Sequence, residues 1–213
     1  MSTVFRTKQR CAVCGEVNEY AVLGSTNAFG SPDLDLRPPE MQRSTMYLWV
    51  RECPGCGYVA EDVEEETTVG ADFLQTPEYR SCGGIGFGSS LAARFCRAHL
   101  IDLQVGRIPE AFHALLHAAW ACDDAGEEEN AVRCRTLALD LVTALIDRKE
   151  DDLETLHLMK ADLLRRTGRF AELKARYEGF TFGEELPDRI LAFQLARAEA
   201  GDTACHRIAD AVS

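Results

Sequence analysis

Two pairs of cysteines constrain this chain more than any other feature of its sequence. Cys11 and Cys14 form one C-x-x-C-G unit, and Cys53 and Cys56 form a second. Two residues between the cysteines let a tight turn point both sulfurs at one cation, and the following glycine takes a positive φ angle without steric cost. Two such turns supply four thiolates, the ligand set of a closed tetrahedral zinc site. We therefore predict one structural Zn²⁺ and no open catalytic position.

Other readings of these cysteines fit the sequence less well. Two unrelated C-x-x-C pairs are the simplest alternative, and a thioredoxin-type redox pair is another, but the latter needs a βαβ context. Here the pairs flank short β-prone stretches at 20–23 and 45–50. The two pairs are separated by 38 intervening residues, which is longer than usual, so we predict an inserted loop at about 26–41. A segment of 60 residues with few large apolar side chains also needs a metal for stability.

The chain divides into three zones by composition. Residues 1–60 form the predicted four-cysteine zinc ribbon with its inserted loop, and residues 61–90 form an acidic and glycine-rich connector. Residues 91–213 are rich in Ala, Leu, Arg and Glu, with apolar residues at helical spacing. We predict an α+β chain in which a small ribbon precedes an all-α domain that folds without it from about Ser89.

The helical zone shows weak internal repetition. Gly126, Gly168 and Gly201 each follow one helical stretch and precede another, and Pro109 and Pro187 fit first helical positions. Three helical hairpins are predicted: 108–125 with 127–148, 151–167 with 169–179, and 187–200 with 202–212. Stacked hairpins of this size build tetratricopeptide-like (TPR-like) solenoids, although a plain helical bundle remains the alternative.

Several stretches resemble one known family. They are SPDLDLRPPEM at 31–41, RSTMYLWV at 43–50, CPGCGYVA at 53–60, FHALLHAAW at 112–120 and LLRRTGRF at 163–170. Together they resemble an uncharacterised bacterial family, a domain of unknown function, that joins a split zinc ribbon ending in C-P-x-C-G-Y to TPR-like helices. The resemblance implies the fold and the four metal ligands, and it implies no reaction.

Charge bears on the class of partner. The net charge is −12, and residues 1–60 hold six basic and six acidic side chains, so the remainder carries the excess. Neither part offers the positive field that drives nucleic-acid binding. No run of eighteen apolar residues exists, and the first residues lack the apolar stretch of a secretory signal. We expect a cytoplasmic protein that binds neither nucleic acid nor membrane.

Weaker signals lie in the loops. The glycine run at 83–88 precedes a helix as a phosphate-binding loop would, but it lacks the lysine of a P-loop. We interpret it as a flexible hinge, with Ser89 or Ser90 capping the helix. Asp33, Asp35 and Arg37 could hold a ligand, but local turn hydrogen bonds and an ion pair are favoured.

One stripe of a predicted helix is a candidate working surface. Glu110, His113, His117 and Trp120 follow helical spacing and are too polar for a core, whereas another stripe should fill the core. That core stripe consists of Phe112, Leu115, Leu116 and Ala119. The candidate partner-binding residues are Glu110, His113, His117, Trp120, Arg165 and Arg166. With both arginines present, the surface would suit a peptide that carries a carboxylate and an apolar anchor.

These observations favour a zinc-binding adaptor over an enzyme. No catalytic residue is assigned, because a metal trio of Glu110, His113 and His117 lacks the general base of a zincin. The remaining five cysteines are scattered, and we interpret them as ordinary thiols. The alternatives are a nucleic-acid-associated zinc-ribbon accessory protein, by analogy of fold, and an enzyme that uses the glycine-rich loop.

Overall fold

A computed structural model describes residues 1–149 and 152–212, and it divides into two compact units. Unit 1 comprises Met1–Ala28 and Glu40–Cys134, and unit 2 comprises Phe29–Pro39 and Arg135–Ser213. The chain is α+β, with a cysteine-rich β part followed by a mostly helical part. The predicted boundaries at residues 60 and 90 are not the boundaries of these units, because the first long helices group with the cysteine-rich part.

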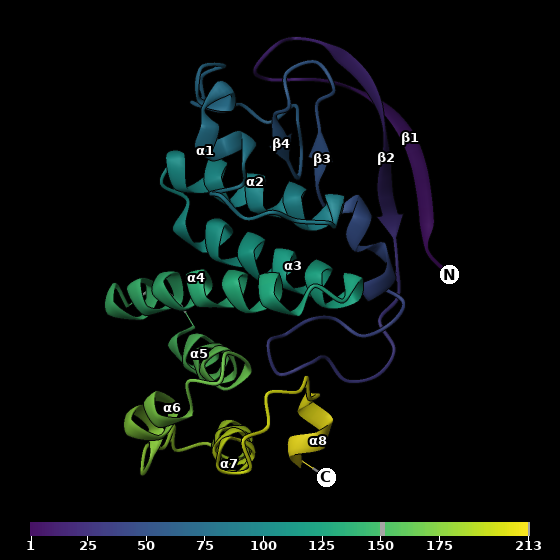
Figure 1. Ribbon diagram of the computed structural model, residues 1–213. Helices are drawn as coiled ribbons and strands as arrows, with labels where there is room; N and C mark the ends of the chain where they lie inside the picture. The colour runs from purple at the N-terminus through teal and green to yellow at the C-terminus, as the bar shows by residue number, and fades with distance from the viewer. Residues whose placement is uncertain (150–151, 213) are drawn as a thin grey trace. The chain divides into compact units, whose positions relative to one another are not determined.

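Two β-hairpins of unit 1 carry the cysteine pairs. β1 (Thr3–Arg10) pairs antiparallel with β2 (Val17–Ser25), and β3 (Arg51–Glu52) pairs antiparallel with β4 (Val59–Ala60). Figure 1 shows the long first hairpin in purple and the short second hairpin beside it. Each C-x-x-C unit lies in the connection between the two strands of a hairpin. The hairpins therefore position both pairs of thiols.

The first hairpin is largely exposed, so side-chain packing contributes little to it. Its register places Lys8 opposite Glu19 and Thr7 opposite Tyr20. Most residues of β1 are exposed. Two-stranded ribbons are marginal in water without further support. A metal at the turn end of this hairpin would supply that support.

The predicted connector is not a hinge. It contains η2 (Phe73–Gln75) and α1 (Pro77–Arg80), and it buries Val63 and Leu74. The hydroxyl of Tyr79, itself buried, donates a hydrogen bond of 2.6 Å to the carbonyl of Gly57, next to the second cysteine pair. The connector is thus part of the core of unit 1.

Two long helices complete that core. α2 (Ser90–Gln104) and α3 (Ile108–Ala125) are joined by a short turn and lie side by side (Figure 1). The side chain of Ser89 accepts a hydrogen bond from the Ala92 N–H, so the predicted cap is confirmed at Ser89. The predicted core stripe is also confirmed, because all four of its residues are completely buried: Phe112, Leu115, Leu116 and Ala119.

The ribbon packs directly on α2. Arg97 of α2 forms an ion pair of 2.5 Å with Glu52 of β3, and Arg94 donates to the carbonyl of Val50. The backbone N–H of Ala12 also bonds to the carbonyl of Val63. The ribbon, the segment after it and α2 therefore form one folded body, which contradicts the prediction of a separate helical domain from Ser89.

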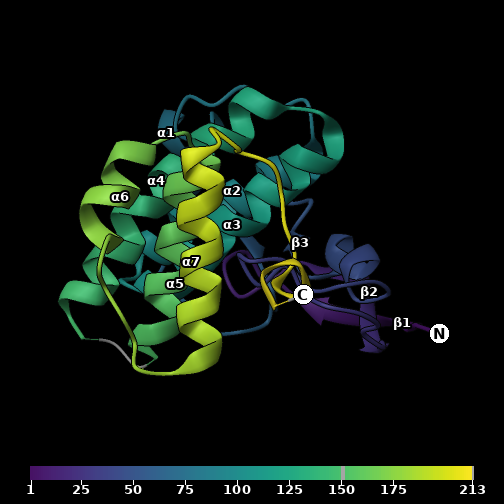
Figure 2. The same ribbon diagram turned by 90° about the horizontal axis from the view of Figure 1, so that it is seen from below.

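The remaining helices match most of the predicted hairpins. α5, α6 and α7 pack on one another, as Figure 2 shows. Their observed bounds, with those of the helix before and the helix after, are α4 (Glu128–Asp147), α5 (Leu153–Arg166), α6 (Phe170–Tyr177), α7 (Glu185–Glu199) and α8 (Ile208–Val212). No helix among residues 1–149 and 152–212 has both the length and the apolar character needed to cross a membrane.

The last predicted helix is shorter than expected, because its backbone pairs elsewhere within unit 2. The N–H of Leu34 donates to the carbonyl of His206, and the N–H of Ile208 donates to the carbonyl of Pro32. These bonds commit the stretch before α8 to an extended pairing with the inserted loop. The prediction of a helix over 202–212 is therefore wrong before Ile208.

Candidate metal centre

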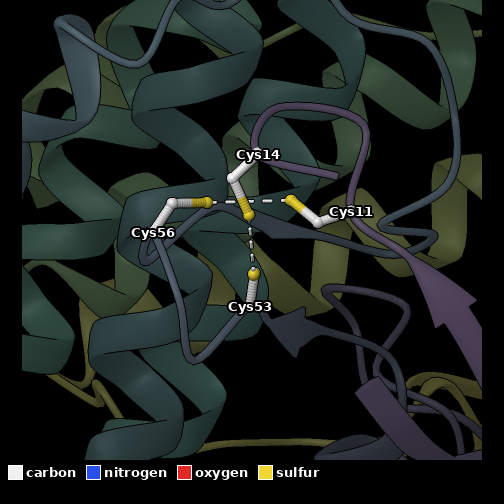
Figure 3. Close-up of side chains that lie close together, drawn as sticks. All are labelled: Cys11, Cys14, Cys53 and Cys56. Atoms are coloured by element: carbon white, nitrogen blue, oxygen red, sulfur yellow. Dashed lines mark hydrogen bonds between the residues drawn. The ribbon is translucent and has the colours of Figure 1, made fainter. Parts of the chain in front are cut away.

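The four predicted thiols meet at one point in unit 1, as Figure 3 shows. The sulfurs of Cys11 and Cys56 are 3.7 Å apart, and those of Cys14 and Cys53 are 3.6 Å apart. All four sulfurs lie within 4.8 Å of one another. A tetrahedron with Zn–S bonds of about 2.3 Å has edges of about 3.8 Å, so these separations fit one tetrahedral cation.

Backbone amides point at these sulfurs from both turns. The Glu16 N–H bonds to the sulfur of Cys14, and the Tyr58 N–H bonds to the sulfur of Cys56, two residues after the cysteine in each case. The glycine between each cysteine and its donor has a positive φ, +75° at Gly15 and +77° at Gly57. The two turns therefore share one geometry, and each presents hydrogen-bond donors to thiolate charge.

In the absence of a metal, burial opposes ionisation of two of the four thiols. Burial raises the pKa of the Cys53 and Cys56 thiols, although backbone N–H groups oppose the shift. At Cys14 the Glu16 N–H dominates and lowers the pKa of the thiol. Burial beside these sulfurs also raises the pKa of Tyr20 to about 12. A bound divalent metal would lower the pKa of all four thiols, because it holds its cysteine ligands as thiolates.

A cleft of about 480 Å³ lies in the same unit. Its lining joins Trp49 of the ribbon to Phe95 and Asp102 of α2 and to His113 and His117 of α3. Glu110 also lines the cleft, so three of the predicted partner-binding residues share one concavity. Among the described residues, the four cysteines are the group whose ligand atoms lie close enough together to hold a metal ion.

His117 lines this cleft and packs among aromatic rings. Its ring centroid is 5.2 Å from that of Trp49, 5.1 Å from that of Phe95 and 4.9 Å from that of Trp120. Burial among these rings lowers the pKa of His117 to about 3. The imidazole is therefore neutral at physiological pH and can accept one hydrogen bond. Partial desolvation also lowers the pKa of His113, although this residue is exposed.

Asp102 and Arg107 form an ion pair on another wall of the cleft. The guanidinium donates two hydrogen bonds to one carboxylate oxygen, at 3.0 and 2.7 Å, and it lies 3.5 Å from Glu65. Burial nevertheless raises the pKa of Asp102 to about 6, against the lowering effect of Arg107. At neutral pH the Asp102 carboxylate is ionised, and the Arg107 guanidinium is paired with Asp102 and Glu65.

The structure corrects two candidate surface residues. Trp120 is 4% exposed and belongs to the core. Arg165 is fully buried in unit 2, where it donates to Asp162 and Gln194 and to the carbonyls of Asp202 and Ala204. Because four acceptors satisfy its guanidinium internally, Arg165 is not available to a partner. Arg166 is half-buried in the same unit, and its role as a surface residue stays a prediction.

The glycine-rich loop already holds an anion of the protein itself. The carboxylate of Glu127 accepts hydrogen bonds from the N–H groups of Gly88 and Ser89, at 3.1 and 2.5 Å. Asn130 donates to the same carboxylate. These N–H groups precede α2 and are the ones that a phosphate would need. The Glu127 carboxylate therefore takes the hydrogen bonds that this loop would offer to a phosphate.

Two further pairs of thiols lie in the core of unit 1. The Cys96 thiol donates to the Cys82 carbonyl at 3.5 Å, and the nearby Cys134 thiol raises the pKa of Cys122. All four residues are buried. The sequence did not reveal this pairing, because the partners belong to different elements. Cys205, in contrast, is exposed.

The inserted loop forms the local turn bonds that the sequence predicted. The Arg37 N–H donates to the Asp35 carboxylate at 3.3 Å, and the Asp33 N–H donates to the Arg37 carbonyl at 3.0 Å. All three residues are at most 7% exposed. The structural interpretation of this loop is therefore supported by its geometry.

Several residues of the cleft were missed in the sequence. Phe95, Ala98 and Asp102 repeat at three- and four-residue steps, so they form a stripe of the same kind as the one on α3. Pairing the two stripes would have indicated the cleft. Trp49, Glu61 and Glu65 carried no such signal, because they are brought there by the ribbon and the segment after it.

Comparison of the chain with protein-family profiles, with curated proteins and with solved structures finds no match in any of the three. The resemblance to a family of split zinc ribbons with TPR-like helices therefore stays a prediction.

Proposed function

We propose that this protein is a cytoplasmic, zinc-binding, non-enzymatic adaptor that presents a concave surface to a protein or peptide partner. One observation carries the proposal: four cysteine sulfurs gather with the separations of a tetrahedral site. Four protein ligands leave no coordination position for a substrate, so a zinc bound there is structural. Its role would be to hold the ribbon against α2, where the cleft is formed.

The binding surface is the second element of the proposal. The volume of the cleft is typical of ligand sites, and its lining combines apolar side chains with charged and polar ones. The TPR-like arrangement of α5, α6 and α7 remains part of the proposal, and stacked hairpins of that kind commonly bind peptides. Nucleic acid is not the proposed partner. A chain with a net charge of −12 neutralises few phosphates and therefore releases few counterions from DNA or RNA.

Metal analysis of the purified protein tests the first element. We expect one zinc per chain, and we expect Cys14→Ser and Cys56→Ser each to lose it and to unfold unit 1. A closed site of this kind contributes on the order of 10 kcal/mol, more than a small domain can spare. Iron in place of zinc would be a substitution by the expression host, since both metals occupy tetrahedral sulfur sites.

Cys205→Ser is the matched control, because Cys205 is exposed and lies in unit 2. This variant should keep the zinc and the thermal stability of the parent chain. If both cysteine-ligand variants retained stoichiometric metal and an intact fold, the proposed metal centre would be wrong.

A further inference from the structure

We infer that the cleft of unit 1 binds a cationic side chain, a lysine ammonium or an arginine guanidinium, carried by a peptide partner. The inference rests on the proposed adaptor function and names the ligand chemistry of its binding surface. It departs from the expectation of a carboxylate-bearing peptide, because that expectation needed free arginines and Arg165 is buried.

The charge of the lining is the first argument. Four carboxylates line the cleft, against one guanidinium. The carboxylates are Glu61, Glu65, Asp102 and Glu110. The guanidinium of Arg107 is already shared between Asp102 and Glu65. The lining thus carries three net negative charges at neutral pH, and concave walls of low dielectric focus such a field onto a ligand.

The hydrogen-bonding capacity of the lining is the second argument. Carboxylates are acceptors only, and the two histidines of the cleft are neutral at physiological pH, so each offers one acceptor nitrogen. His117 makes no hydrogen bond with any described residue, although it is mostly buried. A cleft rich in unused acceptors is complementary to an ammonium with three donors or a guanidinium with five.

The Trp49 ring is the third argument. Trp49 is half-buried in the lining and packs against His117, whereas Phe95 behind them is buried. The Trp49 ring is held in place because its N–H donates to the Thr45 hydroxyl at 3.0 Å. Aromatic faces attract cations, and tryptophan does so most strongly. The alkyl stem of a lysine or arginine would lie along apolar surface, here the half-buried Ala60 and Ala98 of the lining.

A neighbouring hollow indicates a peptide rather than a free amine. A second concavity of about 510 Å³ shares Trp49, Glu61 and Glu65 with the cleft, and Val22, Leu23 and Leu48 also line it. An occupant could therefore extend from the acidic cleft onto the half-buried side chains of Val22 and Leu23 without leaving the lining. The structure favours a short segment in which a basic residue neighbours an apolar one.

Selection from a display library of random heptapeptides on the zinc-loaded full-length chain tests the inference. We expect enriched sequences to share a lysine or arginine next to an apolar residue. A synthetic peptide of the consensus should bind in fluorescence anisotropy, and acetylation of its lysine should weaken binding at least about tenfold, since hydrogen bonds to charged groups contribute about 1.5–3 kcal/mol. Butylammonium alone should compete only in the millimolar range or above.

Matched variants locate the binding. Glu61→Gln with Glu110→Gln removes two charges of the cleft, neither of them in an observed ion pair, and should weaken the peptide about tenfold or more. Glu66→Gln with Glu129→Gln removes the same charge outside both hollows and should change affinity less than about twofold. Zinc content should stay constant in all variants.

The outcomes separate this inference from the adaptor proposal. Enrichment of acidic or uncharged peptides, or equal binding of the acetylated peptide, would overturn the inference and leave the adaptor standing. Enrichment of no sequence on a chain with full zinc content would overturn both.

Discussion

At the scale of single residues, the metal centre has charge to disperse. Four thiolates around one Zn²⁺ would carry a net charge of −2. The amides that face the sulfurs, those of Glu16, Gly55, Cys56 and Tyr58, supply partial positive charge, and the Arg10 guanidinium donates to the Gly15 carbonyl of the first turn at 2.9 Å. The two glycines with positive φ make this possible, since they turn the backbone after each pair.

His117 gives a residue-scale prediction for pH. Its folded pKa of about 3 lies below the 6.5 of an exposed histidine. Its contribution to stability is therefore complete above pH 6.5 and is lost as the pH falls from 6.5 toward 3, at up to about 1.4 kcal/mol per pH unit. The ring resonances of His117 in NMR spectra of the zinc-loaded protein should not shift between about pH 7.5 and 5.5.

The urea-unfolded chain is the control for that titration, because its histidines should titrate near pH 6.5. A midpoint for folded His117 within the window would mean that water reaches the ring freely. The packing against Trp49 and Phe95 would then be wrong.

At the scale of elements, the start of α2 is fixed from another helix. Glu127 closes the glycine-rich loop by accepting from Gly88 and Ser89. Its charge is favourable there, since helix N-termini attract anions. The hydrogen bond from Asn130 and those from the loop lower the pKa of Glu127, so it stays ionised at neutral pH.

Removal of this carboxylate should therefore destabilise unit 1. We expect Glu127→Ala to lower the free energy of unfolding by about 1–2 kcal/mol, the usual cost of a lost helix cap. Urea denaturation at pH 7 with zinc present measures it. Glu129→Ala, at an exposed position in the first turn of α4, should cost less than about 0.5 kcal/mol. Equal effects of the two substitutions would show that the cap is unimportant.

Helix bounds were predictable where local chemistry fixes them. Ile108–Ala125 was predicted as 108–125, because Pro109 suits its first turn and Gly126, with φ of +71°, ends it. The cluster of four cysteines was predictable for the same reason, since two local turns create it. The prediction of a helix before Ile208 was wrong, because the backbone there bonds to residues 32–34, which lie far away in the sequence.

At the scale of the whole molecule, the division into units follows tertiary contacts that composition does not reveal. The acidic and glycine-rich stretch at 61–90 looked like a linker, yet Val63, Leu74 and Tyr79 are buried in unit 1. Conversely, residues 29–39 lie between the cysteine pairs in sequence but belong to unit 2. Only part of the cleft was predictable from the sequence. The residues that α3 contributes follow helical spacing, whereas those that the ribbon contributes follow no pattern.

This division predicts the behaviour of a truncated chain. A fragment that begins at Ser89 loses Glu52, the partner of Arg97, and the buried residues of 61–88. Its α2 and α3 should lose cooperative packing, so circular dichroism should show a broad melt and amide exchange at 95–122 should be fast. The zinc-loaded full chain should melt cooperatively. A sharp melt with slow exchange in the fragment would restore a boundary near residue 89.

The central claim is that Cys11, Cys14, Cys53 and Cys56 hold one zinc ion, and the X-ray absorption spectrum of zinc in the purified protein tests it most directly. The spectrum should show four sulfur neighbours at about 2.3 Å, with no nitrogen or oxygen in the first shell. A first shell that contains nitrogen or oxygen, or protein that binds no stoichiometric tetrahedral metal, would contradict the claim.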